Sequence, residues 1–102
     1  MLLAEISLSP LDKGISLSEH VARCLDVIDR SGLPYRLGAM GTTIEGELSE
    51  VMAVVEACFE ALAEDCDRIS IYLKGDWRRD ASGRLSSKVE TVERILGRKL
   101  ST

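Results

Sequence analysis

The stretch that decides the fold is Leu2-Leu3-Ala4-Glu5-Ile6-Ser7-Leu8-Ser9. Apolar side chains occupy every second position from Leu2 to Leu8, and most of the positions between them are polar. A period of two is typical of a strand with one buried face, so residues 2–9 are expected to form a half-buried strand. Pro10 ends this strand, and residues 11–15 form a loop.

A helix is expected after the loop. Ser16 and Glu19 have the spacing of a capping box, in which the serine is the N-cap and the glutamate reaches back to it. Gly32 suits a left-handed C-terminal cap, and Pro34 prevents the helix from continuing. The predicted apolar face of this helix consists of Val21, Cys24, Leu25 and Ile28.

The same two patterns, alternation for strands and a spacing of three to four residues for helices, predict the rest of the chain. The expected elements are strands at 35–40 and 42–47 joined by Gly41, a helix capped by Ser49, a strand at 68–74, a polar segment at 75–84 and a helix capped by Ser87. In the fourth strand, Ile69, Ile71 and Leu73 are expected to face inward. The second helix should bury a stripe that includes Met52 and Phe59.

This order of elements predicts an α+β fold. Strand–helix–strand–strand–helix–strand, with right-handed crossovers, gives a ferredoxin-like antiparallel sheet of order 4-1-3-2 with two helices on one face, plus a C-terminal helix. A chain of 102 residues has the length of one domain, and residues 1–102 show no internal linker.

Composition narrows the function classes. A net charge of −4 and the absence of aromatic residues on the two central strands argue against a nucleic-acid partner. No apolar run approaches the roughly 20 residues of a membrane span. The three cysteines are odd in number and form no C-x-x-C pair, which favours reduced thiols in a cytoplasmic protein over a disulfide framework or a zinc site.

The sheet face opposite the two helices is the candidate site. The outward side chains of the central strands are Glu5, Ser7, Thr43 and Glu45; Tyr72 and Lys74 join them from the fourth strand, and Arg36 and Met40 from the second. One reading is an ordinary solvated polar face, and another is a recognition surface whose carboxylates accept hydrogen bonds or neutralise a cation. An acid/base pair of Glu5 and Glu45 is less favoured, and the single histidine, His20, is expected to face solvent, so no catalytic residue is assigned.

Several motifs resemble one family. They are Ala4-Glu5-Ile6-Ser7, Ser18-Glu19-His20-Val21, Ser31-Gly32-Leu33-Pro34-Tyr35 and, most specifically, Met40-Gly41-Thr42-Thr43-Ile44-Glu45-Gly46-Glu47. Together they resemble the small thiamine-binding protein family over residues 2 to about 96. The segment at 76–80 fits the family only loosely, so no ligand role is assigned to it.

The resemblance implies a ferredoxin-like fold, a homo-oligomer (commonly a tetramer), and binding of thiamine or its hydroxymethylpyrimidine moiety with no established reaction. No cofactor and no metal are assigned. The ligand zone expected from the motifs and from strand parity consists of Glu5, Ser7, Met40, Thr42, Thr43, Glu45, Tyr72 and Lys74. Trp77 is an alternative stacking residue or an interface anchor. The competing interpretation is an oligomeric structural or regulatory interaction module that has no small-molecule ligand.

Overall fold

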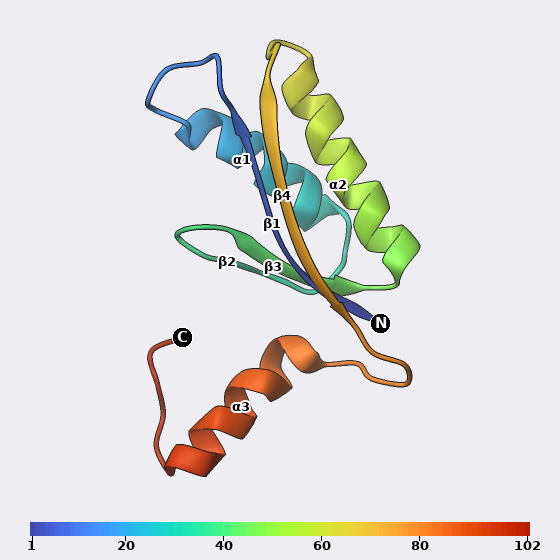
Figure 1. Cartoon of the computed structure of the whole chain (residues 1–102), viewed down its shortest axis with the longest axis vertical. Coiled ribbons are helices and arrows are strands. Elements are labelled where there is room, and N and C mark those ends of the chain that lie inside the picture. The colour runs from blue at the N-terminus through green and yellow to red at the C-terminus, as the bar shows by residue number, and fades with distance from the viewer.

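The computed structural model describes residues 1–102, arranged as a sheet with two helices on one face and a third helix beyond it (Figure 1). The elements are β1 (Leu2–Pro10), α1 (Ser18–Arg30), β2 (Tyr35–Leu37), β3 (Thr42–Gly46), α2 (Leu48–Ala63), β4 (Ile69–Trp77) and α3 (Arg84–Leu96). The strands are antiparallel and lie in the order β2-β3-β1-β4. The predicted α+β ferredoxin-like arrangement and strand order are therefore confirmed.

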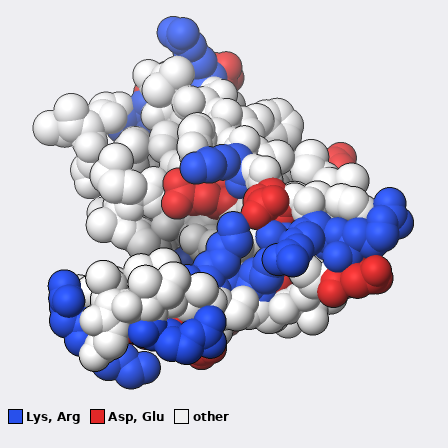
Figure 2. Space-filling model, turned by 60° about the horizontal axis from the view of Figure 1, so that its bottom comes forward, with Lys and Arg blue, Asp and Glu red and all other residues white.

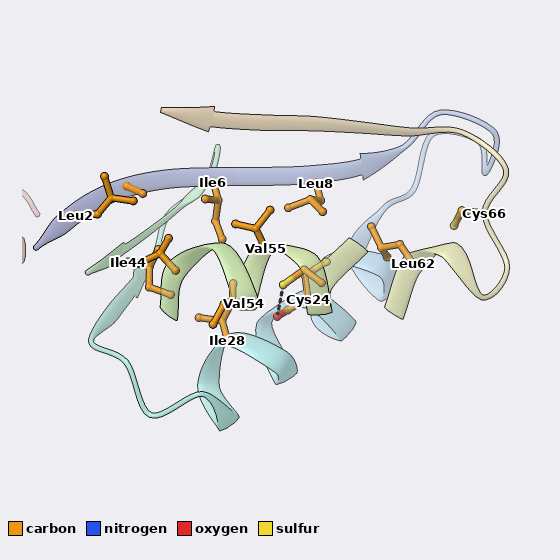
Figure 3. Close-up of a cluster of buried hydrophobic side chains, with 13 residues drawn as sticks. Leu2, Ile6, Leu8, Cys24, Ile28, Ile44, Val54, Val55, Leu62 and Cys66 are labelled. Atoms are coloured by element: carbon orange, nitrogen blue, oxygen red, sulfur yellow. Dashed lines mark hydrogen bonds between the residues drawn. The ribbon is translucent and has the colours of Figure 1, made fainter. Parts of the chain in front are cut away.

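β1 is a central strand, and its period of two is confirmed. The side chains of Leu2, Ala4, Ile6 and Leu8 are all buried on the face that α1 and α2 cover. These helices supply the other half of one apolar core (Figure 3). The core consists of Leu2, Ala4, Ile6, Leu8, Cys24, Ile28, Ile44, Val51, Val54, Val55, Cys58, Leu62 and Cys66.

α1 buries most of the predicted face. Cys24 and Ile28 are buried and Leu25 packs against the core, as predicted, but His20 joins them and Val21 is exposed. The expectation that His20 faces solvent is wrong, because the buried stripe of α1 begins one residue earlier than the apolar pattern indicates. On α2, Met52 and Phe59 are also partly exposed, at the margin of the buried face.

β4 is an edge strand, and its apolar residues are poorly covered. The register pairs Leu73 with Ile6 and Ile71 with Leu8, so both side chains have the predicted helix-face parity. They are nevertheless 39% and 51% exposed at this edge of the sheet. Parity was predicted correctly, but the expected burial of these two residues was not.

Several boundaries differ from the prediction. β2 ends at Leu37, where the Gly38 N–H donates to the Gly41 carbonyl at 2.9 Å and turns the chain. A Cβ at Gly38 would lie 2.8 Å from that carbonyl oxygen, so the tight turn requires glycine. β4 runs on to Trp77, three residues beyond the predicted end, because its pairing with β1 continues as far as Leu2.

The three predicted serine caps are also wrong. α1 follows Leu17 without a side-chain cap, α2 follows Glu47, and α3 follows Gly83 in the left-handed conformation. For α2 the capping group is glutamate, since the Glu47 N–H donates to the Glu50 carboxylate at 2.9 Å. Sequence spacing alone did not distinguish these residues from the nearby serines.

α3 lies on the sheet face that α1 and α2 leave open, and its first turn packs against the sheet. Arg84 at its start is buried, and Glu93 accepts a hydrogen bond from the Leu100 N–H at 2.7 Å, whereas Val92, Ile95 and Leu96 are exposed. Figure 1 shows the rest of the helix extending away from the two-layer body. None of the three helices combines the length and the apolarity needed to cross a bilayer.

Candidate functional site

Glu5 lies at the centre of the open sheet face. Its carboxylate is exposed, and the sheet register places Thr43 of β3 on one side of it and Lys74 of β4 on the other. Directly paired residues of antiparallel strands present their side chains on the same face. A hollow of about 230 Å³ opens here, and its lining is Leu3, Ala4, Glu5, Thr43, Lys74, Gly75, Asp76 and Lys88. We call it the Glu5 hollow.

Gly41 leaves room beside Glu5. A Cβ placed on Gly41 would lie 3.3 Å from Glu5 Cγ and 3.3 Å from the Ile6 carbonyl oxygen. A Cβ placed on Gly46, at the other end of β3, would lie 3.1 Å from Leu33 Cδ1. Both glycines of the Met-Gly-Thr-Thr-Ile-Glu-Gly-Glu motif therefore fit positions where a side chain would crowd its neighbours.

The other predicted site residues are divided among several places. Ser7 and Tyr72 pair in register on the open face, two residues along from Glu5. Thr42 is buried on the helix face, and Met40 lies exposed in the turn before β3. Thr42, Met40 and Ser7 line a separate, mainly apolar cavity of about 310 Å³ between α1, β1 and the β2–β3 turn. The eight predicted residues do not form one site.

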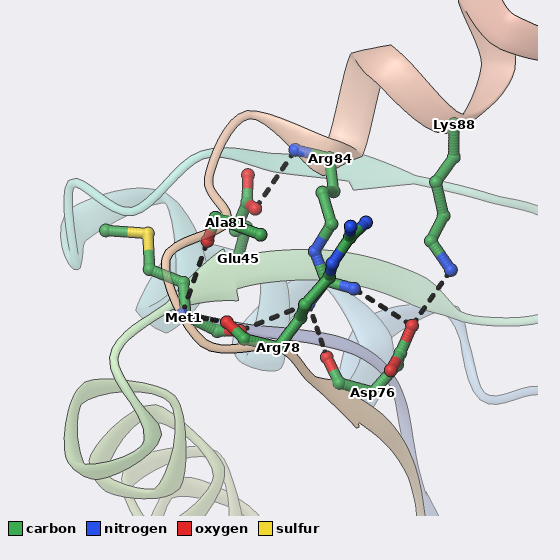
Figure 4. A network of polar contacts seen from close by, with 7 residues as sticks. All are labelled: Met1, Glu45, Asp76, Arg78, Ala81, Arg84 and Lys88. Atoms are coloured by element: carbon green, nitrogen blue, oxygen red, sulfur yellow. Dashed lines mark hydrogen bonds and ion pairs between the residues drawn. The ribbon is translucent and has the colours of Figure 1, made fainter.

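Glu45 has the predicted outward parity but is only 3% exposed, because the start of α3 covers it. The Arg84 backbone N–H donates to its Oε2 at 3.1 Å (Figure 4). A carboxylate at this point pairs with one of the unpaired N–H groups of the first turn and opposes the positive end of the helix dipole. Glu45 thus acts as a cap supplied from a neighbouring strand. It also lines a cavity of about 420 Å³ with Glu50 and the loop before α3.

Sequence reasoning missed the polar network that fixes α3 to the sheet. The buried Arg84 guanidinium donates from Nη1 to Asp76 Oδ2 at 2.9 Å and from Nη2 to the Met1 carbonyl at 3.1 Å (Figure 4). Lys88, one turn later, donates to the same Asp76 oxygen at 2.9 Å. The acidic residue at the end of an alternating strand was the available signal, but that strand was predicted to stop at Lys74.

These cations perturb Asp76. The hydrogen bond from Lys88 and its charge, together with the Arg84 guanidinium, hold the pKa of this carboxyl below its ordinary value of 3.8. Figure 2 shows Lys and Arg side chains next to Asp and Glu side chains at the end of the molecule that carries α3. The Glu5 hollow has the same character, with two carboxylates and two ammonium groups on its rim.

The cysteines are all free and buried. The Cys58 thiol donates to the Cys24 carbonyl at 3.5 Å inside the core. The hydrogen bond with Cys24 and burial together raise the pKa of Cys58 far above the ordinary thiol range. A thiol in this state is protonated and unreactive at neutral pH.

The thiamine-binding protein family model matches residues 4–93, which is most of the chain. The chain belongs to this family. A UPF0045 protein of Mycobacterium bovis is 42% identical over 95 residues, which cover 92% of this chain and 93% of the relative.

Solved structures of similar proteins have the same fold. A hypothetical protein from Methanocaldococcus jannaschii superposes with a TM-score of 0.80 at 35% identity, covering 89% of this chain and 94% of that one. A Thermotoga maritima protein, provisionally described as a thiamine biosynthesis/salvage protein, gives 0.77 at 25% identity, covering 89% and 97%. Membership of the thiamine-binding protein family, expected from the motifs, is therefore confirmed.

Proposed function

We propose that the protein binds thiamine or a related aminopyrimidine in the Glu5 hollow and does not convert it. The observation that carries this proposal is the exposed Glu5 carboxylate, flanked in register by Thr43 and Lys74, in a chain of the thiamine-binding protein family. Thiamine is a cation, and its aminopyrimidine ring offers N–H donors. A carboxylate can accept these donors and offset the charge.

The neighbouring side chains suit the two halves of such a ligand. The Thr43 hydroxyl can donate to or accept from the pyrimidine ring, and Lys74 can pair with a phosphate when the ligand carries one. Tyr72 lies on the same face and can stack on a ring, an interaction of about 0.5–1.5 kcal/mol. Trp77 is the weaker stacking candidate, because it pairs with Leu2 on the helix face and carries Arg79 over its ring at 5.2 Å.

We propose further that the protein is a homotetramer, built as a pair of dimers. Two separate surfaces support this. The β4 edge exposes Ile71 and Leu73, and the outer part of α3 exposes Val92, Ile95 and Leu96. Dihedral tetramers use two different self-complementary contacts, and these are two different surfaces.

A cytoplasmic location is part of the same proposal. The chain has three unpaired buried thiols. Thiols remain reduced in the cytosol and tend to be oxidised in secretory compartments.

Calorimetric titration with thiamine, thiamine phosphates and hydroxymethylpyrimidine tests the proposed ligand. We expect at least one of the three to bind wild type, and Glu5→Gln to weaken that ligand at least about tenfold. A charge-assisted hydrogen bond contributes about 1.5–3 kcal/mol, and 1.4 kcal/mol is tenfold in affinity. Glu60→Gln, on the exposed side of α2, is the matched control and should bind like wild type.

The outcomes separate the two function classes. If Glu5→Gln binds the ligand as tightly as wild type does, the ligand occupies another cavity. Glu45→Gln then tests the cavity that Glu45 and Glu50 line. If none of the three compounds binds an intact oligomer, the interaction-module interpretation takes over. The exposed apolar surfaces of β4 and α3 are the specific observation in favour of that second candidate.

A further inference from the structure

A cluster of three potential metal ligands lies at the opposite side of the fold from α3. His20 comes from the first turn of α1, and Asp65 and Cys66 come from the turn between α2 and β4. One ligand atom from each residue lies within 4.8 Å of the other two. His20 and Cys66 are 46 positions apart in the sequence, so the cluster does not match any short metal-binding motif.

The histidine provides a second, independent observation. Its side chain is only 9% exposed, and no protein group lies within hydrogen-bond reach of its buried Nδ1. Buried polar atoms in native proteins nearly always have a partner. Imidazole nitrogen is also among the commonest metal ligands in proteins.

The other two ligands are held in place. Cys66 is 6% exposed and lies at one end of the core cluster, beyond Leu62 (Figure 3). Its thiol is 3.5 Å from Asp65 Oδ1. Arg23 binds both oxygens of Asp65, at 3.0 and 3.3 Å, and hydrogen-bonded outer groups of this kind orient metal-binding carboxylates.

The loop that carries these residues is tied to the β1–α1 loop. The Asp67 N–H donates to Asp12 Oδ2 at 2.8 Å, and the Leu11 N–H donates to the Arg68 carbonyl at 2.8 Å. These two hydrogen bonds hold the loop before α1 next to the turn that carries Cys66.

We propose that His20, Asp65 and Cys66 form a Zn²⁺ site with one open coordination position. Zinc takes imidazole nitrogen, thiolate sulfur and carboxylate oxygen at about 2.0–2.3 Å. Tetrahedral coordination at these lengths places ligand atoms roughly 3.3–3.8 Å apart. The Sγ–Oδ1 pair already satisfies this, and the widest pair must close by about 1 Å.

Metal binding at this site requires the Cys66 thiol to lose its proton. The metal replaces the Cys66 thiol proton, which leaves to solvent, and it binds His20 through the lone pair of a ring nitrogen. Three protein ligands leave the fourth tetrahedral position to water or an exogenous ligand. The proposal is independent of the ligand assigned to the Glu5 hollow.

Titration of the untagged, chelator-treated full chain with Co²⁺, then Zn²⁺, tests the site. We expect one Co²⁺ per chain with a thiolate-to-cobalt charge-transfer band that Zn²⁺ abolishes by displacement. Even outer-shell losses cost about 10–100-fold in metal affinity, so Cys66→Ser should lose the band and at least about 100-fold in affinity. Cys58→Ala removes a core thiol outside the cluster and should keep the band.

A second readout uses wild type alone. The chain has a single histidine, so its ring resonances in the NMR spectrum are unambiguous and should shift in slow exchange with one equivalent of Zn²⁺. Circular dichroism establishes that each variant is folded. Any of three results would overturn the proposal: no charge-transfer band in wild type, a band that persists in Cys66→Ser, or His20 resonances that do not shift when Zn²⁺ is added.

Discussion

Glu5 and Glu45 share one face of the sheet, yet the structure gives them different surroundings. Glu5 is exposed between Thr43 and Lys74, whereas Glu45 is covered and accepts a backbone N–H from Arg84. Strand parity predicts the face to which a side chain points, and both predictions of parity were correct. Parity cannot reveal that a helix 39 residues later folds over one of the two carboxylates.

Removal of the Glu45 carboxylate should loosen the start of α3. In Glu45→Ala the Arg84 N–H loses a charge-assisted bond of about 1.5–3 kcal/mol, so its amide exchange should accelerate by about ten- to a hundredfold. Hydrogen exchange followed by NMR measures this directly. Glu60→Ala is the control, and equal Arg84 exchange in wild type and Glu45→Ala would contradict the capping role.

Gly41→Ala should weaken any ligand bound by Glu5. The added methyl group would lie 3.3 Å from Glu5 Cγ, and the backbone oxygen of Ile6 at the same distance leaves it little room to retreat. Displacement of the Glu5 side chain should reduce affinity by at least a few-fold, with a smaller effect on folding, since the site is at the surface. Calorimetry measures the affinity, and unchanged binding would show that the position of Glu5 is unimportant.

At the scale of elements, the sequence was most informative where contacts are local or simply periodic. The alternation from Leu2 to Leu8 records burial under two helices, and it predicted β1 almost to the residue. The N-terminal caps were wrong because several polar residues near each helix start could serve. For α3, the carboxylate near the first N–H comes from β3, a partner that no local pattern contains.

Acidification should release α3 through Asp76. Lys88 and Arg84 lower the pKa of Asp76 below its ordinary value of 3.8. The ionised carboxyl therefore stabilises the docked helix when the pH is above 3.8. This contribution is lost as the pH falls below 3.8 and through the lowered pKa, and no loss is expected from this group between pH 5 and 8. Trp77, the only tryptophan, ends β4 next to Asp76, and its fluorescence should report the change.

Asp76→Asn separates this effect from other carboxyl groups. Asp12 and Asp65 also have lowered pKa values, owing to the Asp67 N–H and to Arg23 respectively, and they titrate in the same range. The variant should have looser α3 docking at neutral pH and should lack the Asp76 component of the fluorescence transition. An identical acid transition in both proteins would exclude Asp76 as its cause.

At the scale of the whole molecule, the site was less predictable than the fold. Thr42 and Met40 were placed in the ligand zone by their motif, but they line the cavity on the helix face. His20 was expected in solvent because one polar residue does not reveal how a helix is rotated against its neighbours. Each of these outcomes depends on contacts between segments far apart in the chain, which periodicity cannot describe.

The exposed apolar surfaces lead to a prediction about assembly. Ile71 on β4 and Ile95 on α3 are 51% and 77% exposed, so their replacement by lysine should cost the isolated chain little stability. A lysine in a packed self-contact, in contrast, places an unpaired charge between two copies. Light scattering should therefore give a tetramer for wild type, dimers for Ile71→Lys and for Ile95→Lys, and monomers for the double variant. Glu60→Lys, which changes the net charge from −4 to −2 on an exposed part of α2, should remain tetrameric. A monomeric wild type, or a tetramer that survives both substitutions, would show that these surfaces do not join copies of the chain.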